Sequence, residues 1–112
     1  MIGTPIAFAV AAAAGALARA AVGRRLNGGF PWGTFSVNVS GSFALGLLAH
    51  VSAFAATVFG TGLIGAYTTY SSFARDIVAL WERDARGAAL AYAAASIMAC
   101  VAVAWIALTI IS

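Results

Sequence analysis

The sequence predicts an all-α membrane protein, one domain over residues 1–112 with four transmembrane helices, the third of them broken near its middle. Three observations support this class. Hydrophobic residues make up 63% of the chain and charged residues only 8%, whereas a soluble domain carries about 25% charged residues. Apolar stretches of about 20 residues, the length that crosses a bilayer, follow one another with short connections. One of these stretches is interrupted by a polar, glycine-rich segment.

The apolar stretches place the four predicted helices. They cover residues 4–23, 31–52, 55–81 and 87–111. Pro31 opens the second helix, because proline fits a first helical turn, where its missing N–H is not needed. Trp32 and Trp81 lie at helix ends, where aromatic side chains anchor a protein at the membrane surface. Small residues recur along the helices, which favours close packing and oligomerisation.

The third helix carries the most informative segment, "GTGLIGAYTTYSSFARD" at residues 60–76. Glycines, hydroxyl side chains and aromatic rings are concentrated there, and we expect the helix to be interrupted between Gly65 and Tyr70. Non-helical backbone at membrane depth is tolerated only where protein buries it or where it lines a wet cavity. The segment therefore predicts a path for an ion or a polar substrate.

Three polar side chains within the predicted spans are the most informative. Arg19 is flanked by apolar residues, and a central arginine costs about 2.5–3.5 kcal/mol to insert. It must face a wet vestibule, pair with a carboxylate or reach back to the membrane surface. Asn38 lies deep in the second helix, and its amide either joins helices or presents N–H groups to an anion. Asp76 follows Arg75, and an ion pair with an arginine is its simplest role.

Several function classes are excluded. The six basic residues are all arginines at helix ends and loops, whereas nucleic-acid binding needs basic residues gathered on a soluble face. Cys100, the single cysteine, lies in an apolar run without metal-ligand spacing, and we expect a small buried hydrophobic residue. "GTGLIG" matches a dinucleotide motif but lacks the strand that the motif requires. The only histidine, His50, lies at a membrane edge. We therefore predict that the chain is not an enzyme.

Three segments together resemble the Fluc-type (CrcB-type) fluoride channel family. These are "GALAR" at residues 15–19, "FPWGTFSVNVSGSFALGLL" at residues 30–48, and residues 60–76. The resemblance covers essentially the whole chain. It implies four-helix subunits in antiparallel, inverted-topology dimers with two pores, in the cell membrane of a prokaryote. The implied activity is a multi-pass ion channel that exports fluoride passively, with a structural Na⁺ at the dimer interface.

The resemblance also implies roles for individual residues. The fluoride pore would be lined by Asn38, Tyr70, Ser71, Ser72 and Phe73, with Tyr92 and Ser96 from the fourth helix. Arg19 would lie in the vestibule, and the backbone carbonyls of Gly65 and Thr68 would hold the Na⁺. Asp76 stands at an acidic position that the family usually fills with Glu. The family usually has Phe where this chain has Tyr70, whose hydroxyl either bonds fluoride or blocks it.

Two other functions would each explain part of the sequence. A small multidrug-type exporter has the same length and helix number, but its proton coupling needs a carboxylate in the first helix, and the first acidic residue here is Asp76. A non-transporting membrane assembly subunit would explain the small residues. It would not explain Asn38 together with the hydroxyl and aromatic residues of the third helix.

The arginines also predict an orientation. Arg24 and Arg25 lie in the first loop, Arg83 and Arg86 in or beside the third, and the second loop has no Lys or Arg. Because basic loops stay on the cytoplasmic side, both chain ends are predicted outside. An antiparallel homodimer needs both orientations, so the bias leads to the hypothesis of a heterodimer with an oppositely oriented paralogue. The alternative is an ordinary dual-topology homodimer.

Overall fold

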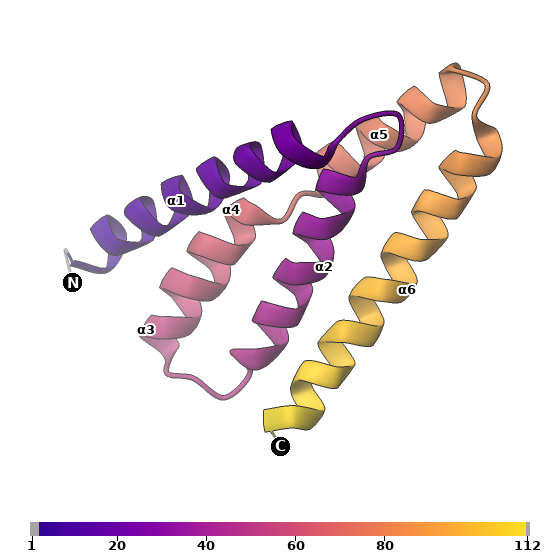
Figure 1. The fold of residues 1–112 in the computed structure, drawn as a ribbon. Helices are drawn as coiled ribbons and strands as arrows, with labels where there is room; N and C mark the ends of the chain where they lie inside the picture. The colour runs from indigo at the N-terminus through magenta and orange to yellow at the C-terminus, as the bar shows by residue number, and fades with distance from the viewer. Residues whose placement is uncertain (1–2, 112) are drawn as a thin grey trace.

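The computed structural model describes residues 3–111, which fold into helices joined by short turns. In chain order these are α1 Gly3–Leu26, α2 Trp32–Leu47, α3 Ala53–Ala55, the π-helix η1 Ala56–Ile64, α4 Gly65–Tyr67, α5 Tyr70–Glu82 and α6 Arg86–Ile111. The segments α3, η1 and α4 follow one another without interruption and form one continuous rod (Figure 1). The all-helical prediction is therefore confirmed for the described residues.

Two of the described helices, α1 and α6, are long and apolar enough to cross a membrane, judged by length and composition. They agree closely with the first and fourth predicted helices. The prediction for the second helix was wrong at its end, because α2 stops at Leu47 and not near Ser52. Residues 48–51 form turns instead, and the Ser52 side chain caps α3 by accepting a hydrogen bond from the Ala55 N–H at 3.2 Å. The predicted total of four membrane crossings stays a prediction.

The third helix is interrupted inside the predicted interval. Thr68 and Thr69 have extended backbone, with ψ angles of 156° and 120°. The Thr69 hydroxyl then starts α5 by accepting a hydrogen bond from the Ser72 N–H at 3.0 Å, the usual role of threonine at a helix N-terminus. The π-helical stretch before the break was not predicted.

Glycines set the closest approaches between helices. Helix α1 packs along η1 and α4, while α2 packs along α6. A Cβ atom added at Gly15 would meet the Leu63 carbonyl oxygen, and one at Gly46 would lie 2.8 Å from the Ala107 Cβ atom. Any larger residue at these two positions would push the helices apart.

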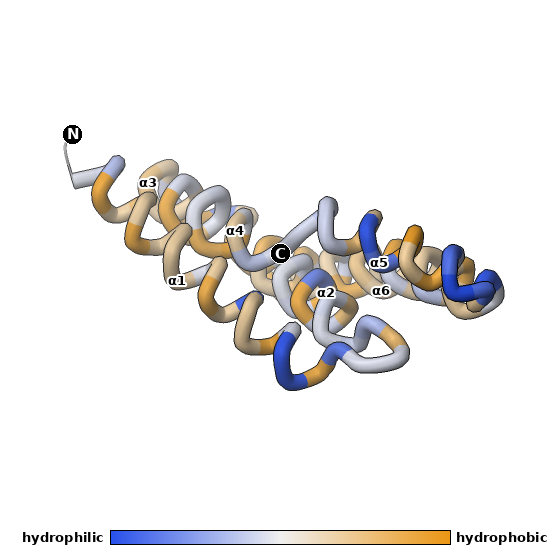
Figure 2. The backbone as a smooth tube through the Cα atoms, turned by 90° about the horizontal axis from the view of Figure 1, so that it is seen from above, coloured by the Kyte–Doolittle hydropathy of each residue, from blue (hydrophilic) through white to orange (hydrophobic). Residues whose placement is uncertain are grey.

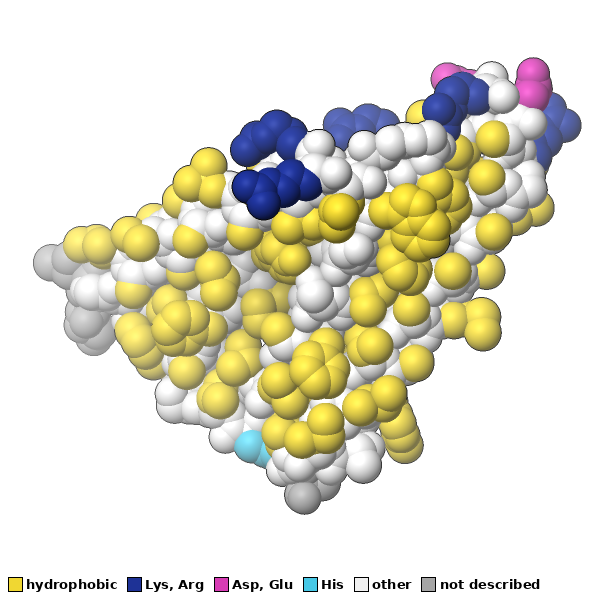
Figure 3. All heavy atoms as spheres, in the orientation of Figure 1, with side chains coloured by type: hydrophobic (Ala, Val, Ile, Leu, Met, Phe, Trp, Pro, Cys, Tyr) yellow, Lys and Arg dark blue, Asp and Glu magenta, His cyan; other side chains and the backbone are white. Residues whose placement is uncertain are grey.

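The molecule is flat, with extents of 50 × 30 × 19 Å. Since a helix with its side chains is about 10–12 Å across, the thickness allows fewer than two full layers, as Figure 2 shows from above. Few large side chains are fully buried; Val37 and Tyr92 are the largest of them. Apolar side chains cover much of the face seen in Figure 3. Such a surface suits a lipid or protein environment.

The arginines near the first and third connections gather at one end of the molecule. Their prediction as loop residues was wrong for three of them, because Arg24 and Arg25 lie in the last turn of α1 and Arg86 opens α6. An Nη atom of Arg83, after α5, donates a hydrogen bond to the Gly29 carbonyl oxygen at 3.0 Å, in the loop between α1 and α2. Figure 3 shows the arginines along one edge and the histidine at the opposite edge. The two connections and the arginines beside them therefore lie on the same side, as the sequence predicts.

Candidate functional site

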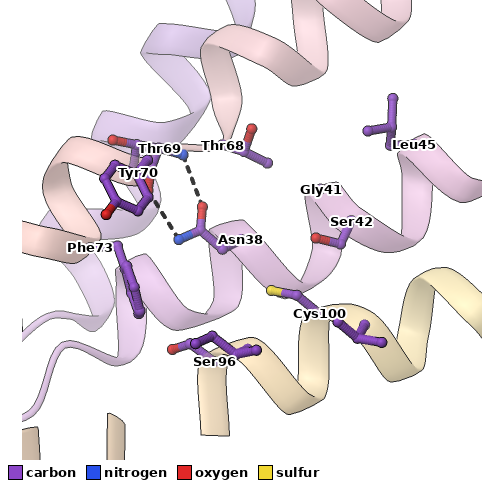
Figure 4. Close-up of a pocket in the computed structure, with 12 residues that line it drawn as sticks. Asn38, Gly41, Ser42, Leu45, Thr68, Thr69, Tyr70, Phe73, Ser96 and Cys100 are labelled. Atoms are coloured by element: carbon purple, nitrogen blue, oxygen red, sulfur yellow. Dashed lines mark hydrogen bonds between the residues drawn. The ribbon is translucent and has the colours of Figure 1, made fainter. Parts of the chain in front are cut away.

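Asn38 holds the helix break in place. Its Nδ2 atom donates to the Thr69 carbonyl oxygen at 3.2 Å, and its Oδ1 atom accepts from the Thr69 N–H at 2.9 Å (Figure 4). One side chain thus pairs with both the N–H and the carbonyl of the extended residue Thr69. Backbone groups outside a helix need such partners in an apolar setting, because no water is available to them. An amide nitrogen carries two hydrogens, so Asn38 can join helices and still offer a second N–H.

A close approach on the same face of α2 also positions the break. A Cβ atom at Gly41 would meet the Thr68 side chain, so only glycine lets the break lie this near to α2. A little beyond, the Ser40 and Tyr67 hydroxyl oxygens lie 2.9 Å apart. Successive residues from Tyr67 to Thr69 at the break are therefore each in contact with α2.

The break leaves several carbonyl oxygens without their helical donors, and those of Gly65 and Thr68 are among them. In a continuous helix the Gly65 carbonyl would accept from the Thr69 N–H, and the Thr68 carbonyl from the Ser72 N–H. Here Thr69 donates to Asn38, and Ser72 donates to the Thr69 hydroxyl. These are the two carbonyls that the sequence resemblance assigns to a cation. Oxygen donors of this kind suit a hard cation, so the residues fit such an ion.

Two helix ends of opposite polarity meet at the break. The rod α3–η1–α4 ends there in carbonyl groups, which favour positive charge, whereas α5 begins there in N–H groups, which favour negative charge. The Arg19 Nε atom donates to the Ala66 carbonyl oxygen at 3.1 Å. Arg19 thus has a helix-terminal carbonyl as its partner, a solution that sequence reasoning did not include.

Aromatic rings in tilted contact lead from the break towards the interior. The Tyr70 and Phe73 ring centroids lie 6.2 Å apart, and those of Phe73 and Tyr92 lie 5.2 Å apart. Tyr70 is 81% exposed, whereas Tyr92 is fully buried. The Tyr92 hydroxyl donates to the Asp76 carboxylate at 3.2 Å. The simplest prediction for Asp76, an ion pair with an arginine, was wrong, because Tyr92 on α6 takes that place.

An open groove runs beside the break between α2 and α6. It has a volume of about 390 Å³. The predicted site residues that line it are Asn38, Thr68, Tyr70, Phe73 and Ser96. The Ser96 hydroxyl is buried and has no hydrogen-bond partner in the described part of the chain. Cys100 also lines the groove and is half-buried. The prediction that it is a buried hydrophobic residue was therefore wrong. Figure 4 shows these side chains around the common space.

A second, more polar cavity of about 190 Å³ lies on the other side of Thr69, which lines both. Arg19, Arg75 and Ser72 contribute to its wall, and an Arg75 Nη atom donates to the Ser72 hydroxyl at 3.4 Å. Ser71 is exposed, and its hydroxyl oxygen lies 3.4 Å from that of Thr69. Predicted site residues therefore lie in two cavities that share Thr69, whereas Gly65, Ser71 and Tyr92 line neither of them.

Sequence reasoning did not assign a role to Thr69 or Cys100. The signal for Cys100 was present, because Tyr92, Ser96 and Cys100 recur at four-residue intervals, which places them on one helix face. Thr69 had no comparable signal. Its role depends on the approach of Asn38, which lies 31 positions earlier in the chain.

Comparison with known proteins identifies the family. The family model described as CrcB-like protein, Camphor Resistance (CrcB), matches residues 6–108. The chain belongs to the CrcB family. Similar CrcB-type proteins include a "Fluoride-specific ion channel FluC" of Chelativorans sp., 48% identical over 84 residues, which are 69% of this chain and 67% of the relative. The protein of the same name from Rhodospirillum centenum is 40% identical over 104 residues, covering 83% and 82% of the two chains.

A further CrcB relative extends over more of the sequence. "Fluoride-specific ion channel FluC 1" of Symbiobacterium thermophilum is 37% identical over 117 aligned positions, covering 94% of each chain. These relatives are bacterial and are named as ion channels, which confirms the prediction that this chain is not an enzyme. Together with the apolar helices α1 and α6, they identify a bacterial membrane protein.

Proposed function

We propose that this chain is a subunit of a fluoride-selective channel that lets fluoride leave the cell passively. The observation that carries the proposal is the groove in which the Asn38 amide, the Phe73 ring and the unpaired Ser96 hydroxyl converge beside the helix break. Relatives named fluoride-specific ion channels supply the identity of the ion. The groove without such relatives would support only a path for some polar species.

The donors in the groove suit a small anion. Fluoride holds its water strongly, so a path must replace that water with N–H and O–H donors and with the positive edges of aromatic rings. The N-terminus of α5, which begins at Tyr70, adds a favourable field for negative charge. An inside-negative voltage drives an anion outward with about 2.3 kcal/mol per charge for each 100 mV. No energy source other than that voltage is needed for export.

The proposed subunit crosses the membrane four times, with α1, α2, the broken rod from α3 to α5, and α6. The 16 residues of α2 span about 24 Å at 1.5 Å per residue. Pro31 before the helix and the turns of residues 48–51 after it extend the span towards the ~30 Å hydrocarbon thickness. The interrupted third crossing remains acceptable in lipid because Asn38 satisfies the extended peptide.

The proposed working unit is an antiparallel dimer with two pores. One flat chain, 19 Å thick, leaves the groove open and Tyr70 81% exposed, so a second subunit is needed to enclose the path. A structural Na⁺ would be held between the subunits by the carbonyls of Gly65 and Thr68. The ion would offset the repulsion between two broken helices whose carbonyl ends face each other.

We also propose that the chain inserts in one orientation and pairs with an oppositely oriented paralogue. The contact between Arg83 and the Gly29 carbonyl supports this, because it joins the two connections beside which the arginines of α1, α5 and α6 lie. The opposite end has His50 and no Lys or Arg between α2 and α3. A bias this strong favours a single topology, with the arginine-bearing end in the cytoplasm.

Cysteine accessibility tests the orientation. Single cysteines are introduced as Ser52→Cys and Arg86→Cys in a Cys100→Ser background, and each is labelled from one side of the membrane at a time. Labelling of Ser52→Cys only from outside and of Arg86→Cys only from inside is expected. Labelling of each from both sides would refute the fixed orientation and leave the dual-topology homodimer.

The function itself is tested by anion efflux from liposomes that contain the purified chain. A fluoride electrode follows release after valinomycin sets the voltage, and chloride release is measured in parallel. Fast fluoride release without chloride release is expected, either from the chain alone or after co-expression with a paralogue of opposite charge bias. Folded, co-assembled protein that releases no fluoride would refute the channel.

A further inference from the structure

Two arginines at the end of α1 have no partner within the described chain. Arg24 and Arg25 lie in the last turn of α1, and both side chains are exposed. Neither makes a hydrogen bond, an ion pair or a ring contact with any of residues 3–111. The other four arginines each have such a contact: Arg19, Arg75 and Arg83 donate hydrogen bonds, and Arg86 lies over the Trp81 ring. Both guanidinium groups at the end of α1 are therefore free to bind a group from outside the chain.

The charge at this end is not balanced. Residues 24–31 contain two arginines and no acidic residue, whereas residues 82–86 contain two arginines and two acidic residues. The remaining acid, Asp76, accepts a hydrogen bond from Tyr92 between α5 and α6. Figure 3 shows basic side chains alone near the end of α1, and basic beside acidic side chains at the turn between α5 and α6. The end of α1 therefore keeps an uncompensated positive charge.

The length of α1 places this end at the membrane surface. Its 24 residues span about 36 Å at 1.5 Å per residue, which exceeds the ~30 Å hydrocarbon thickness. The last turn of α1, as a membrane-crossing helix, therefore reaches the level of the phospholipid phosphates. Arginine suits that level because its planar set of N–H donors matches the oxygens of a phosphate group.

The start of α2 brings an aromatic ring to the same end. A Cβ atom added at Gly33 would lie 2.8 Å from the Gly23 Cα atom, so the first turn of α2 packs against the last turns of α1. Arg24 and Trp32 are the sequence neighbours of these two glycines, and Trp32 is 55% exposed. Because tryptophan is enriched at the level of the lipid headgroups, the ring supports the same placement.

The connection between the two helices is held in one arrangement. The Asn27 N–H donates to the Gly23 carbonyl oxygen at 3.0 Å, and the Asn27 Oδ1 atom accepts from the Thr34 N–H at 3.1 Å. Asn27 thus joins the end of α1 to the start of α2. A surface whose backbone is already fixed loses less entropy when a ligand binds.

We infer that Arg24 and Arg25 form a binding surface for the phosphate of an anionic phospholipid. The inference goes beyond the proposed fluoride channel and does not depend on it, because it concerns only the end of α1 in a membrane. Each arginine near an anionic membrane surface strengthens binding about fivefold, so the pair should favour an anionic headgroup over a neutral one by more than about tenfold. Among residues 82–86 the opposite charges cancel, and no comparable surface is expected there.

The experiment measures lipid binding to the purified full chain in a neutral detergent, by native mass spectrometry at about 0.15 M ionic strength, where only close charges still interact. Phosphatidylglycerol and phosphatidylcholine with the same acyl chains are titrated separately, because both contain a phosphate and only the first has a net negative charge. Phosphatidylglycerol is expected to bind at least about tenfold more tightly. Equal binding of the two lipids would overturn the inference, since it would show contact with acyl chains alone.

Two charge-matched double variants locate the surface. Arg24→Gln with Arg25→Gln should bring phosphatidylglycerol binding to within about threefold of phosphatidylcholine binding, whereas Arg83→Gln with Arg86→Gln should keep the selectivity. Size-exclusion chromatography verifies folding and assembly, and the use of detergent removes any effect of the arginines on membrane orientation. If loss of the Arg83 contact with the Gly29 carbonyl prevents folding, the single variants Arg25→Gln and Arg86→Gln give the same comparison. An equal loss of selectivity at both ends would overturn the assignment to α1.

Competition identifies the source of the phosphate. Inorganic phosphate is added to the protein with phosphatidylglycerol at equal concentration, and little displacement is expected because acyl chains also contribute to lipid binding. Complete displacement would overturn the lipid assignment and indicate a site for a soluble anion. No step of this experiment measures fluoride. A chain that binds the lipid and conducts no fluoride would therefore contradict only the proposed function, whereas a conducting chain without lipid selectivity would contradict only this inference.

Discussion

Replacing Asn38 by aspartate is the sharpest test of the groove, because it changes charge and donor capacity at nearly constant volume. The introduced carboxylate can still accept from the Thr69 N–H, as the Oδ1 atom does at 2.9 Å. It cannot donate to the Thr69 carbonyl oxygen, where the Nδ2 atom now lies at 3.2 Å. The substitution therefore preserves half of the contact that holds the break and places a negative charge on the wall of the groove.

The magnitude follows from Coulomb's law and the lost bond. Two like charges about 4 Å apart repel by about 4 kcal/mol at an effective dielectric constant of 20. The lost hydrogen bond at the break adds about 1 kcal/mol of destabilisation to the fold. A barrier higher by about 4 kcal/mol lowers the rate about a thousandfold. Asn38→Asp should thus nearly abolish fluoride efflux while the protein still folds and assembles.

The assay is liposome efflux at about pH 8, far above the ordinary carboxyl pKa of about 4, with size-exclusion chromatography to verify assembly. Asn27→Asp is the matched control. The Asn27 Oδ1 atom accepts from the Thr34 N–H at 3.1 Å near the start of α2, a contact that a carboxylate also makes. Its efflux should fall less than about tenfold, since exposed charges are screened by salt. Equal efflux from both variants would refute the assignment of Asn38 to the ion path.

Three further predictions follow from single contacts. Gly41→Ala places a methyl group against the Thr68 side chain and should destabilise the protein by about 1–3 kcal/mol. Gly87→Ala, with no atom within 4 Å of the new methyl group, should not, and equal melting temperatures in detergent would contradict the close approach. Tyr92→Phe removes the hydrogen bond to the Asp76 carboxylate and should lower stability by about 1.5 kcal/mol; an unchanged thermal unfolding midpoint would show that the bond contributes nothing. Tyr70→Phe removes a hydroxyl from a ring that is 81% exposed, so fluoride efflux should stay within about threefold. A complete loss of efflux would instead make that hydroxyl essential.

Local chemistry made much of the fold predictable. Long apolar stretches gave α1 and α6, and the concentration of glycine and threonine between Gly65 and Tyr70 gave the position of the break. The predicted end of α2 was wrong because residues 48–51 are apolar enough to continue a helix. In the structure these residues form turns, and Ser52 is the N-cap of the next helix. Where a helix ends depends on the dihedral angles and hydrogen bonds of its capping residues, which a hydropathy pattern does not show.

The contacts that build the site were less predictable because they join distant parts of the chain. Asn38 was identified as a polar residue with two possible roles, but its partner Thr69 depends on how α2 meets the break. The bond between Tyr92 and Asp76 likewise depends on the packing of α6 against α5. The residue types restrict what these side chains can do, whereas the fold decides which partner each one meets.

The arrangement at the break explains why one segment carries so many hydroxyl and amide partners. Asn38 and the Thr69 side chain take the N–H groups that would otherwise bond the Gly65 and Thr68 carbonyls. The same hydrogen bonds that satisfy the extended peptide therefore take the helical donors away from these two carbonyl oxygens. Helix α5 begins at the same place, and its first residue, Tyr70, lines the groove. A continuous helix offers neither feature, so the interruption sets a carbonyl end, which favours positive charge, next to an N–H end, which favours negative charge.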